Sequence, residues 1–120
     1  MKRKRAVRPA SPAHAVTTER AARLYRLLEL LDGGPKSRSV LMRRLKLDVR
    51  GFYRDLGLLR DCGILLQLEK HRYRLEEKLA HAVLRLPFPD PLLSLGEAVQ
   101  LAKGRSAAHR KLKEQLARIM

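Results

Sequence analysis

Three side chains that can bind nucleic acid lie close together near the middle of the chain: Arg50, Tyr53 and Arg54. If this segment is helical, the two arginines are four residues apart on one face, with the tyrosine beside them. Arginine can form bidentate hydrogen bonds with guanine or phosphate, and a tyrosine hydroxyl can donate to phosphate. The spacing therefore predicts a helical surface that contacts DNA base edges and the DNA backbone.

The charge of the chain favours a polyanionic partner. The 120 residues include 27 Lys and Arg against 12 Asp and Glu, a formal net charge of +15. Clustered cations gain free energy from counterion release when they bind phosphates. Five cations and no acids lie in residues 1–16, which we expect to form a disordered basic tail. Such a tail either solubilises the chain or tracks a phosphate backbone.

Enzyme, metal and membrane functions find no support in the sequence. The four histidines are too far apart for a recognisable metal motif, and the single cysteine, Cys62, permits no internal disulfide. No paired carboxylates, Ser-His-Asp arrangement or glycine-rich phosphate loop can be identified. No apolar run approaches the ~18 residues of a membrane helix. We therefore expect an intracellular protein that is not an enzyme and has no catalytic residue, cofactor or metal ligand.

Helical periodicity predicts the elements that must position the arginines. Apolar residues recur at helical spacing over about 18–32 and 38–46, and again over 49–62, where Gly63 ends the pattern. The N-caps predicted for these three helices are, in order, Thr17 or Thr18, Ser37, and Asp48. Ser37 and Arg38 begin the second helix, where free amides favour an anion, so we expect this pair to hold a phosphate.

The predicted third helix has two distinct faces. Phe52, Leu56 and Leu59 form a stripe that should be buried, which leaves Arg50 and Arg54 on the opposite side. Three further arginines lie off the apolar stripe of the first helix, and we expect them only to be solvated. These are Arg20, Arg23 and Arg26.

A β-hairpin is predicted after the third helix. Residues 64–69 and 72–75 are strand-like, and Lys70 and His71 form the turn between them. With Arg72, these turn residues make a basic tip that should touch the DNA backbone or the minor groove.

The last third of the chain is predicted to be a linker followed by helices. Residues 77–93 include three prolines and read as a linker. The overlapping residues 76–86 fit either a helix or a strand. Residues 94–120 then read as a helical segment with helices over 95–103 and 106–119. The last helix carries a narrow apolar stripe that either packs on the domain or pairs with another chain as a dimer. That stripe comprises Leu112, Leu116 and Ile119.

The order of helix, helix, tight turn, helix and basic hairpin is typical of a winged helix-turn-helix. We therefore predict a mainly α-helical fold with a small β-hairpin: a winged helix-turn-helix over 17–76 followed by C-terminal helices. The third helix, 49–62, would occupy the major groove, and the wing, 64–75, would lie on the backbone.

Several segments resemble bacterial WYL-domain transcriptional regulators. Residues 45–56 are similar to the family's recognition segment, and Tyr-Arg-Asp-Leu at 53–56 is the specific part. Leu-Arg-Asp-Cys-Gly-Ile at 59–64, Tyr-Arg-Leu at 73–75 and the capped segment at 91–98 also match the family's pattern. The likeness covers about residues 18–104 and does not reach the family's ligand-sensing domain.

The resemblance implies a bacterial, cytoplasmic, nucleoid-associated transcription regulator. It implies DNA contacts at Arg50, Tyr53 and Arg54, while Gly51 replaces a threonine that is a contact residue in the family. Asp55 should brace neighbouring side chains, since phosphates repel a carboxylate. We expect either a stand-alone DNA-binding protein or one whose sensing comes from another chain.

The sequence thus predicts a sequence-preferring, double-stranded DNA-binding transcription regulator, with a homodimer as one option for its assembly. A low-specificity nucleoid or RNA-binding protein and a winged-helix protein-interaction module are the alternatives. The candidate DNA-binding residues are Ser37, Arg38, Arg50, Gly51, Tyr53, Arg54, Lys70, His71 and Arg72.

Overall fold

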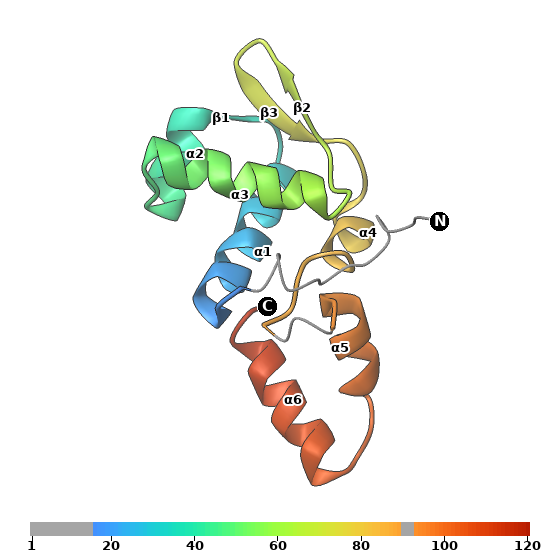
Figure 1. Cartoon of the computed structure of the whole chain (residues 1–120). Helices are drawn as coiled ribbons and strands as arrows, with labels where there is room; N and C mark the ends of the chain where they lie inside the picture. The colour runs from blue at the N-terminus through green and yellow to red at the C-terminus, as the bar shows by residue number, and fades with distance from the viewer. Residues whose placement is uncertain (1–15, 90–92) are drawn as a thin grey trace, which may run out of the picture.

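The computed structural model describes residues 16–89 and 93–120, and it confirms a mainly α-helical protein with a small antiparallel sheet (Figure 1). The helices are α1 (Thr18–Asp32), α2 (Arg38–Leu45), α3 (Val49–Asp61), α4 (Leu79–Val83), α5 (Leu95–Leu101) and α6 (Ala107–Ala117). The strands are β1 (Lys36–Ser37), β2 (Leu66–Glu69) and β3 (Arg72–Leu75). The predicted basic tail, except for Val16, and residues 90–92 of the predicted linker lie outside the described residues.

Local capping signals set the starts of the helices. Three helices begin at a predicted N-cap whose side-chain oxygen accepts a hydrogen bond from a backbone N–H of the first turn: Thr17, Ser37 and Asp48. Ser94 caps α5 in the same way. Gly63 follows α3 with a φ of 81°, as expected for the residue that ends it. The predicted bounds of the first three helices are confirmed to within one residue.

The core is aliphatic and centres on α1. Leu24, Leu27 and Leu28 of this helix are fully buried, and α2, α4 and β3 pack around it. From α3, Phe52 and Leu59 are also fully buried, as predicted. The third member of the predicted stripe, Leu56, is only half-buried, and the buried face of α3 also includes Asp55 and Leu58.

The segment predicted as a linker contributes to the core. Leu86 and Phe88 are almost fully buried, and Pro87 forms an isolated antiparallel bridge with Ser94. Only the five residues of α4 are helical here, so neither the helix nor the strand proposed for 76–86 describes the whole stretch. Part of the predicted linker is thus packed on the core, because apolar side chains between the prolines find room there.

The apolar stripe of α6 packs within the same chain. Leu116 and Ile119 belong to the buried core, and Leu112 packs against it. Of the two uses predicted for this stripe, the structure has the intramolecular one. A dimer would therefore need a different surface.

The sheet ties the hairpin to the start of α2. Its strand order is β1-β3-β2, and the unpredicted strand β1 pairs with β3 through Lys36 opposite Tyr73 and Ser37 opposite Arg72. The hairpin turn has positive φ values of 52° at Lys70 and 67° at His71, as two-residue turns between twisted strands require. This pairing fixes the position of the wing relative to α2.

Candidate nucleic-acid interface

The turn before α3 is tightly packed and fixes where that helix begins. The Asp48 carboxylate accepts a hydrogen bond of 2.7 Å from the backbone N–H of Gly51. A Cβ atom at Gly51 would lie 3.0 Å from Asp48 Oδ1 and 3.2 Å from Leu47 Cδ2, closer than most real Cβ contacts. The glycine therefore lets Leu47 and Asp48 close the turn. The structure thus gives Gly51 a role in the turn.

The opposite face of α3 presents the arginines to solvent. Arg50 and Arg54 are exposed, and Tyr53 is 46% exposed. Within the described ranges, no hydrogen bond or ion pair holds the guanidinium of Arg50 or of Arg54. Their donors are therefore available to an external partner.

A buried carboxylate holds the inner side of α3 against α1. Asp55 is 1% exposed, and its Oδ1 accepts from Arg20 Nε at 2.9 Å while Oδ2 accepts from Arg23 Nε at 2.7 Å. Arg23 Nη2 adds a third bond of 3.2 Å to Oδ1, and Arg20 Nη2 reaches the Arg54 carbonyl at 3.4 Å. Asp55 thus braces neighbouring side chains, as expected.

The expectation that the α1 arginines are only solvated was wrong for two of them. Arg20 and Arg23 pair with Asp55, and of the three arginines Arg26 alone is in the exposed class. One signal in the sequence could have revealed this. Asp55 follows Phe52 by three residues, so it lies on the buried face of the helix, and a buried carboxylate needs a partner of opposite charge.

Side chains from three separate segments meet in a hollow of about 290 Å³ between α2, α3 and the hairpin. Its lining comprises Ser37, Arg38, Ser39, Tyr53, Leu68, His71 and Tyr73. Arg38 Nη1 donates to the Tyr53 hydroxyl at 3.0 Å, and the Arg38 guanidinium carbon is 5.9 Å from the centroid of the Tyr53 ring. The structure therefore brings together Ser37, Arg38, Tyr53 and His71 from the predicted set.

The two tyrosines of this hollow have opposite electrostatic environments. The pKa of Tyr53 is lowered, first by the hydrogen bond from Arg38 and next by the phenol of Tyr73. The pKa of Tyr73 is raised, chiefly by desolvation on burial and then by its hydrogen bond with Tyr53. Because the Tyr53 oxygen accepts from Arg38, the Tyr53 hydroxyl proton is available to an external acceptor such as a phosphate oxygen.

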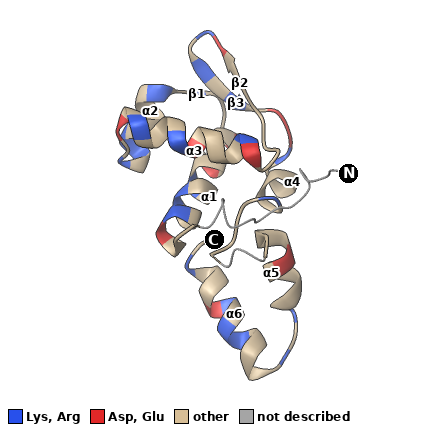
Figure 2. Cartoon of the chain, in the orientation of Figure 1, with Lys and Arg blue, Asp and Glu red and all other residues tan. Residues whose placement is uncertain are grey.

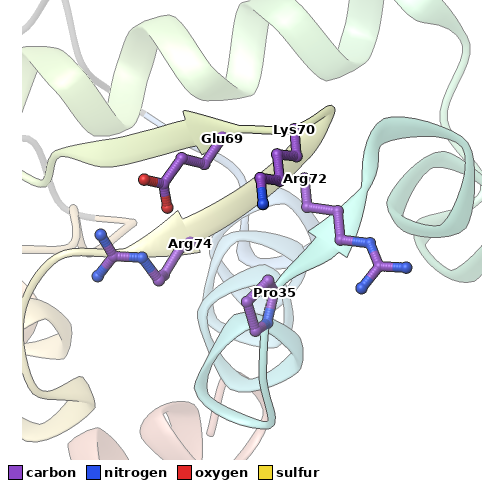
Figure 3. A pocket seen from close by; sticks show the side chains of 5 residues that line it. All are labelled: Pro35, Glu69, Lys70, Arg72 and Arg74. Carbon is purple, nitrogen blue, oxygen red and sulfur yellow. The ribbon is translucent and has the colours of Figure 1, made fainter.

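The other face of the hairpin carries a second basic hollow, of about 470 Å³ (Figure 3). It is lined by Pro35, Glu69, Lys70, Arg72 and Arg74. Figure 3 shows the charged side chains extending around this space from β2, β3 and their turn. Lys70 and Arg72 of the predicted set thus lie here, apart from His71.

Arg74 lies beside this hollow and was absent from the predicted set. It donates a hydrogen bond to Gln67, its cross-strand neighbour. The alternation of Arg72 and Arg74 with buried Tyr73 and Leu75 was the available signal, since side chains two apart on a strand share a face.

The described part of the chain offers little support for other chemistry. In residues 16–89 and 93–120, no group of three or more His, Cys, Asp or Glu side chains could hold a metal ion. Cys62 is buried, and desolvation followed by the charge of Asp61 raises the pKa of its thiol to about 11. None of the helices described is long and apolar enough to cross a bilayer.

Comparison of the chain with protein-family models, curated proteins and solved structures finds no match. The resemblance to WYL-domain regulators stays a prediction, and the functional argument rests on the geometry of α3, the start of α2 and the hairpin.

Proposed function

We propose that this protein is a sequence-preferring double-stranded DNA-binding protein that regulates transcription. In this proposal α3 enters the major groove and the β2–β3 hairpin lies on the adjacent backbone. One observation carries it: α3 buries Phe52, Asp55 and Leu59, while the guanidinium groups of Arg50 and Arg54 are exposed and have no partner among the described residues.

The geometry of α3 suits the major groove. B-DNA's major groove is ~12 Å wide and admits one helix, and residues near the start of that helix reach the base edges. Arg50 and Arg54 lie in the first two turns of α3. A guanidinium can bind guanine O6 and N7 in a bidentate manner, which is a source of sequence preference.

The surroundings of α3 suit the phosphate backbone. The start of α2 places the Arg38 guanidinium next to the Tyr53 hydroxyl in one hollow, at the helix end whose dipole favours an anion. Because β1 pairs Ser37 with Arg72, the hairpin is held next to this hollow. One phosphate group at the start of α2 would fix the register of the bases under α3.

Selection of bound duplexes from a random pool, followed by fluorescence anisotropy with a selected duplex, tests the proposal. We expect a recurrent motif among the selected duplexes and an affinity at least tenfold above that for random duplex. If ~6 phosphates are contacted, log affinity should fall with log salt at a slope of about −5.

Arginine substitutions separate α3 from bulk charge. Arg50→Ala and Arg54→Ala should weaken binding to the selected duplex, whereas Arg26→Ala removes the same charge from the exposed side of α1 and should change affinity less than twofold. Equal affinities for the three variants and the native protein would contradict the assignment of α3.

A low-specificity nucleic-acid-binding protein is the second candidate. Gly51 favours it, because the helix has a glycine where the family resemblance implies a threonine that is a contact residue. A Cβ atom at this position would crowd Leu47 and Asp48 of the preceding turn. Selection without a recurrent motif but with strong duplex binding would support this candidate. Absence of any duplex affinity would instead support a protein-interaction module.

A further inference from the structure

A second cationic surface lies in the C-terminal part of the chain. Residues 102–120 contain six Lys and Arg and one acid, Glu114. All six cations are exposed: Lys103, Arg105, Arg110, Lys111, Lys113 and Arg118. We call these six residues the α6 surface. Their charge lies outside the segments that carry the proposed function.

The α6 surface is held in place by the fold. Because Leu116 and Ile119 point into the core, the cations of α6 fall on its outward side. Arg110 and Lys113 border a shallow hollow of about 300 Å³ with Glu114 and Ala117.

The loop before α6 is also ordered by specific contacts. Ser106 and His109 form a capping box: the Ser106 backbone N–H donates to His109 Nδ1 at 3.2 Å, and the His109 N–H donates to Ser106 Oγ at 3.2 Å. Gly104 makes room for this, since a Cβ atom there would lie 2.4 Å from the His109 ring. Arg110 Nη1 donates to the Arg105 carbonyl at 3.3 Å and ties the loop to α6.

The two cationic surfaces lie at opposite ends of the molecule. Figures 1 and 2 show α2, α3 and the hairpin at one end and the α5–α6 pair at the other, with α1 and α4 between them. The longest extent of the molecule is 48 Å. This exceeds the ~8 Å Debye length at physiological ionic strength, so two duplexes bound at the two ends would repel each other only weakly.

We propose that the α6 surface binds a second segment of duplex DNA, so that one molecule bridges two segments. The inference rests on the proposed function for the first segment. Residues 93–120 contain no Phe, Tyr or Trp, and the cations are spread over a helix and a loop. Protein interfaces depend on aromatic or well-packed anchors, whereas backbone binding by spread cations needs none, so duplex phosphates fit this surface better than an acidic protein does.

A capture assay with the full chain tests the bridge. A biotinylated duplex containing a selected site is fixed on beads, and the retention of a second, labelled duplex of random sequence is measured with and without protein. The test variant is Lys111→Glu with Lys113→Glu. The matched control is Arg26→Glu with Lys78→Glu, which changes the net charge equally at exposed positions outside both surfaces.

The inference requires one pattern of results. The test variant should lose about tenfold in retained duplex, because phosphate binding at the α6 surface becomes repulsive. Its affinity for the single selected duplex, measured by anisotropy, should stay within twofold, and the control should retain bridging. Circular dichroism and light scattering confirm that each variant folds and keeps the native mass.

Three outcomes would overturn the inference. Bridging by the test variant at the native level would assign it to another surface or to a dimer. An equal loss of retained duplex in the test and control variants would make bridging an effect of net charge alone. Loss of single-duplex affinity along with bridging would place α6 in the first interface. Failure of the proposed function has a separate readout, namely unchanged single-duplex affinity in Arg50→Ala and Arg54→Ala.

Discussion

Two pairs of arginines lie on opposite sides of α3, and they differ in exposure and in hydrogen bonding. Arg20 and Arg23 reach from α1 to the inner side of α3, where Asp55 accepts hydrogen bonds of 2.9 and 2.7 Å from their Nε atoms. Arg50 and Arg54 lie on the outer side, exposed and without a side-chain partner in the described ranges. The inner pair is structural, and the outer pair is free to bind a partner.

The comparison shows that a nearby buried carboxylate determines whether an arginine has a structural role or is left exposed to solvent. All four arginines have similar sequence surroundings, with apolar residues three or four positions away. An ion pair at the Asp55 site satisfies a carboxylate that has lost its water, so the inner arginines stabilise the contact between α1 and α3. The outer arginines keep their water until a partner displaces it.

Removal of the inner carboxylate should have the largest effect. We expect Asp55→Ala to lower the free energy of unfolding by about 2–4 kcal/mol, because Arg20 and Arg23 are left facing each other without a counter-charge. The estimate is below that for fully buried pairs because the two arginine side chains are 24% and 30% exposed. Urea denaturation measures the change.

An exposed carboxylate provides the control for this prediction. Glu114→Ala removes an acid from the outer side of α6 and should change stability by less than about 0.5 kcal/mol. If Asp55→Ala were as mild as Glu114→Ala, the inner pair would be no more structural than the outer one, and the comparison would fail.

Removal of an outer arginine should affect binding and leave stability unchanged. Arg54→Ala is expected to cost about 1–3 kcal/mol in affinity for a selected duplex and to relax the preference at one base pair, since a bidentate base contact is lost. Its unfolding free energy should stay within about 0.5 kcal/mol of the native value. Anisotropy and urea denaturation on the same samples measure both quantities. A stability loss comparable to that of Asp55→Ala would show that Arg54 is held by the fold.

Removal of the N-cap of α3 should have an intermediate effect on stability, because the cap supports the whole helix and therefore both of its faces. Asp48→Ala removes the acceptor of the Gly51 N–H and should lower stability by about 1 kcal/mol. Asp48→Asn keeps an acceptor oxygen and serves as the matched control, with a smaller loss. A change in stability equal for the two variants would mean that the charge of Asp48, and not its hydrogen bond, supports the helix.

Gly57 on the outer side should give the smallest effect, and in the opposite direction. A Cβ atom at Gly57 would meet only Arg60 Nη2, at an ordinary 3.7 Å, so Gly57→Ala should raise the unfolding free energy by about 0.5–1 kcal/mol. If DNA approaches the helix backbone at this residue, duplex affinity will fall in the same variant. If affinity is unchanged, the contact surface ends nearer to Arg54. A loss of stability would contradict the open environment of Gly57.

Local signals in the sequence predicted much of the fold. The N-caps at Ser37 and Asp48, the glycine at 63 and the hairpin with its turn at Lys70 are where they were expected. Each depends on a few neighbouring residues, which is why the sequence reveals it. The exposure of Arg50 and Arg54 also follows from helical periodicity, since the opposite stripe is apolar.

Other features depend on residues that are far apart in the chain. Strand β1 has two residues and no strand-like pattern, and it exists because β3 offers it a partner. Phe88 lies between prolines in a stretch that resembles a linker, yet the core accommodates its side chain. Such long-range pairing and packing leave no periodic trace in a single sequence.

The sequence by itself determined the first three helices and their caps, the hairpin and the strong positive charge, because each arises from local backbone preferences or from composition. Only the tertiary structure decided which arginines are paired and which are free. Arg20 and Arg23 are separated from Asp55 by more than thirty residues, and folding brings them within hydrogen-bonding distance because the apolar faces of α1 and α3 share one core. The same packing places α6 at the opposite end of the molecule from α3, a position that the spacing of residues in the sequence does not reveal.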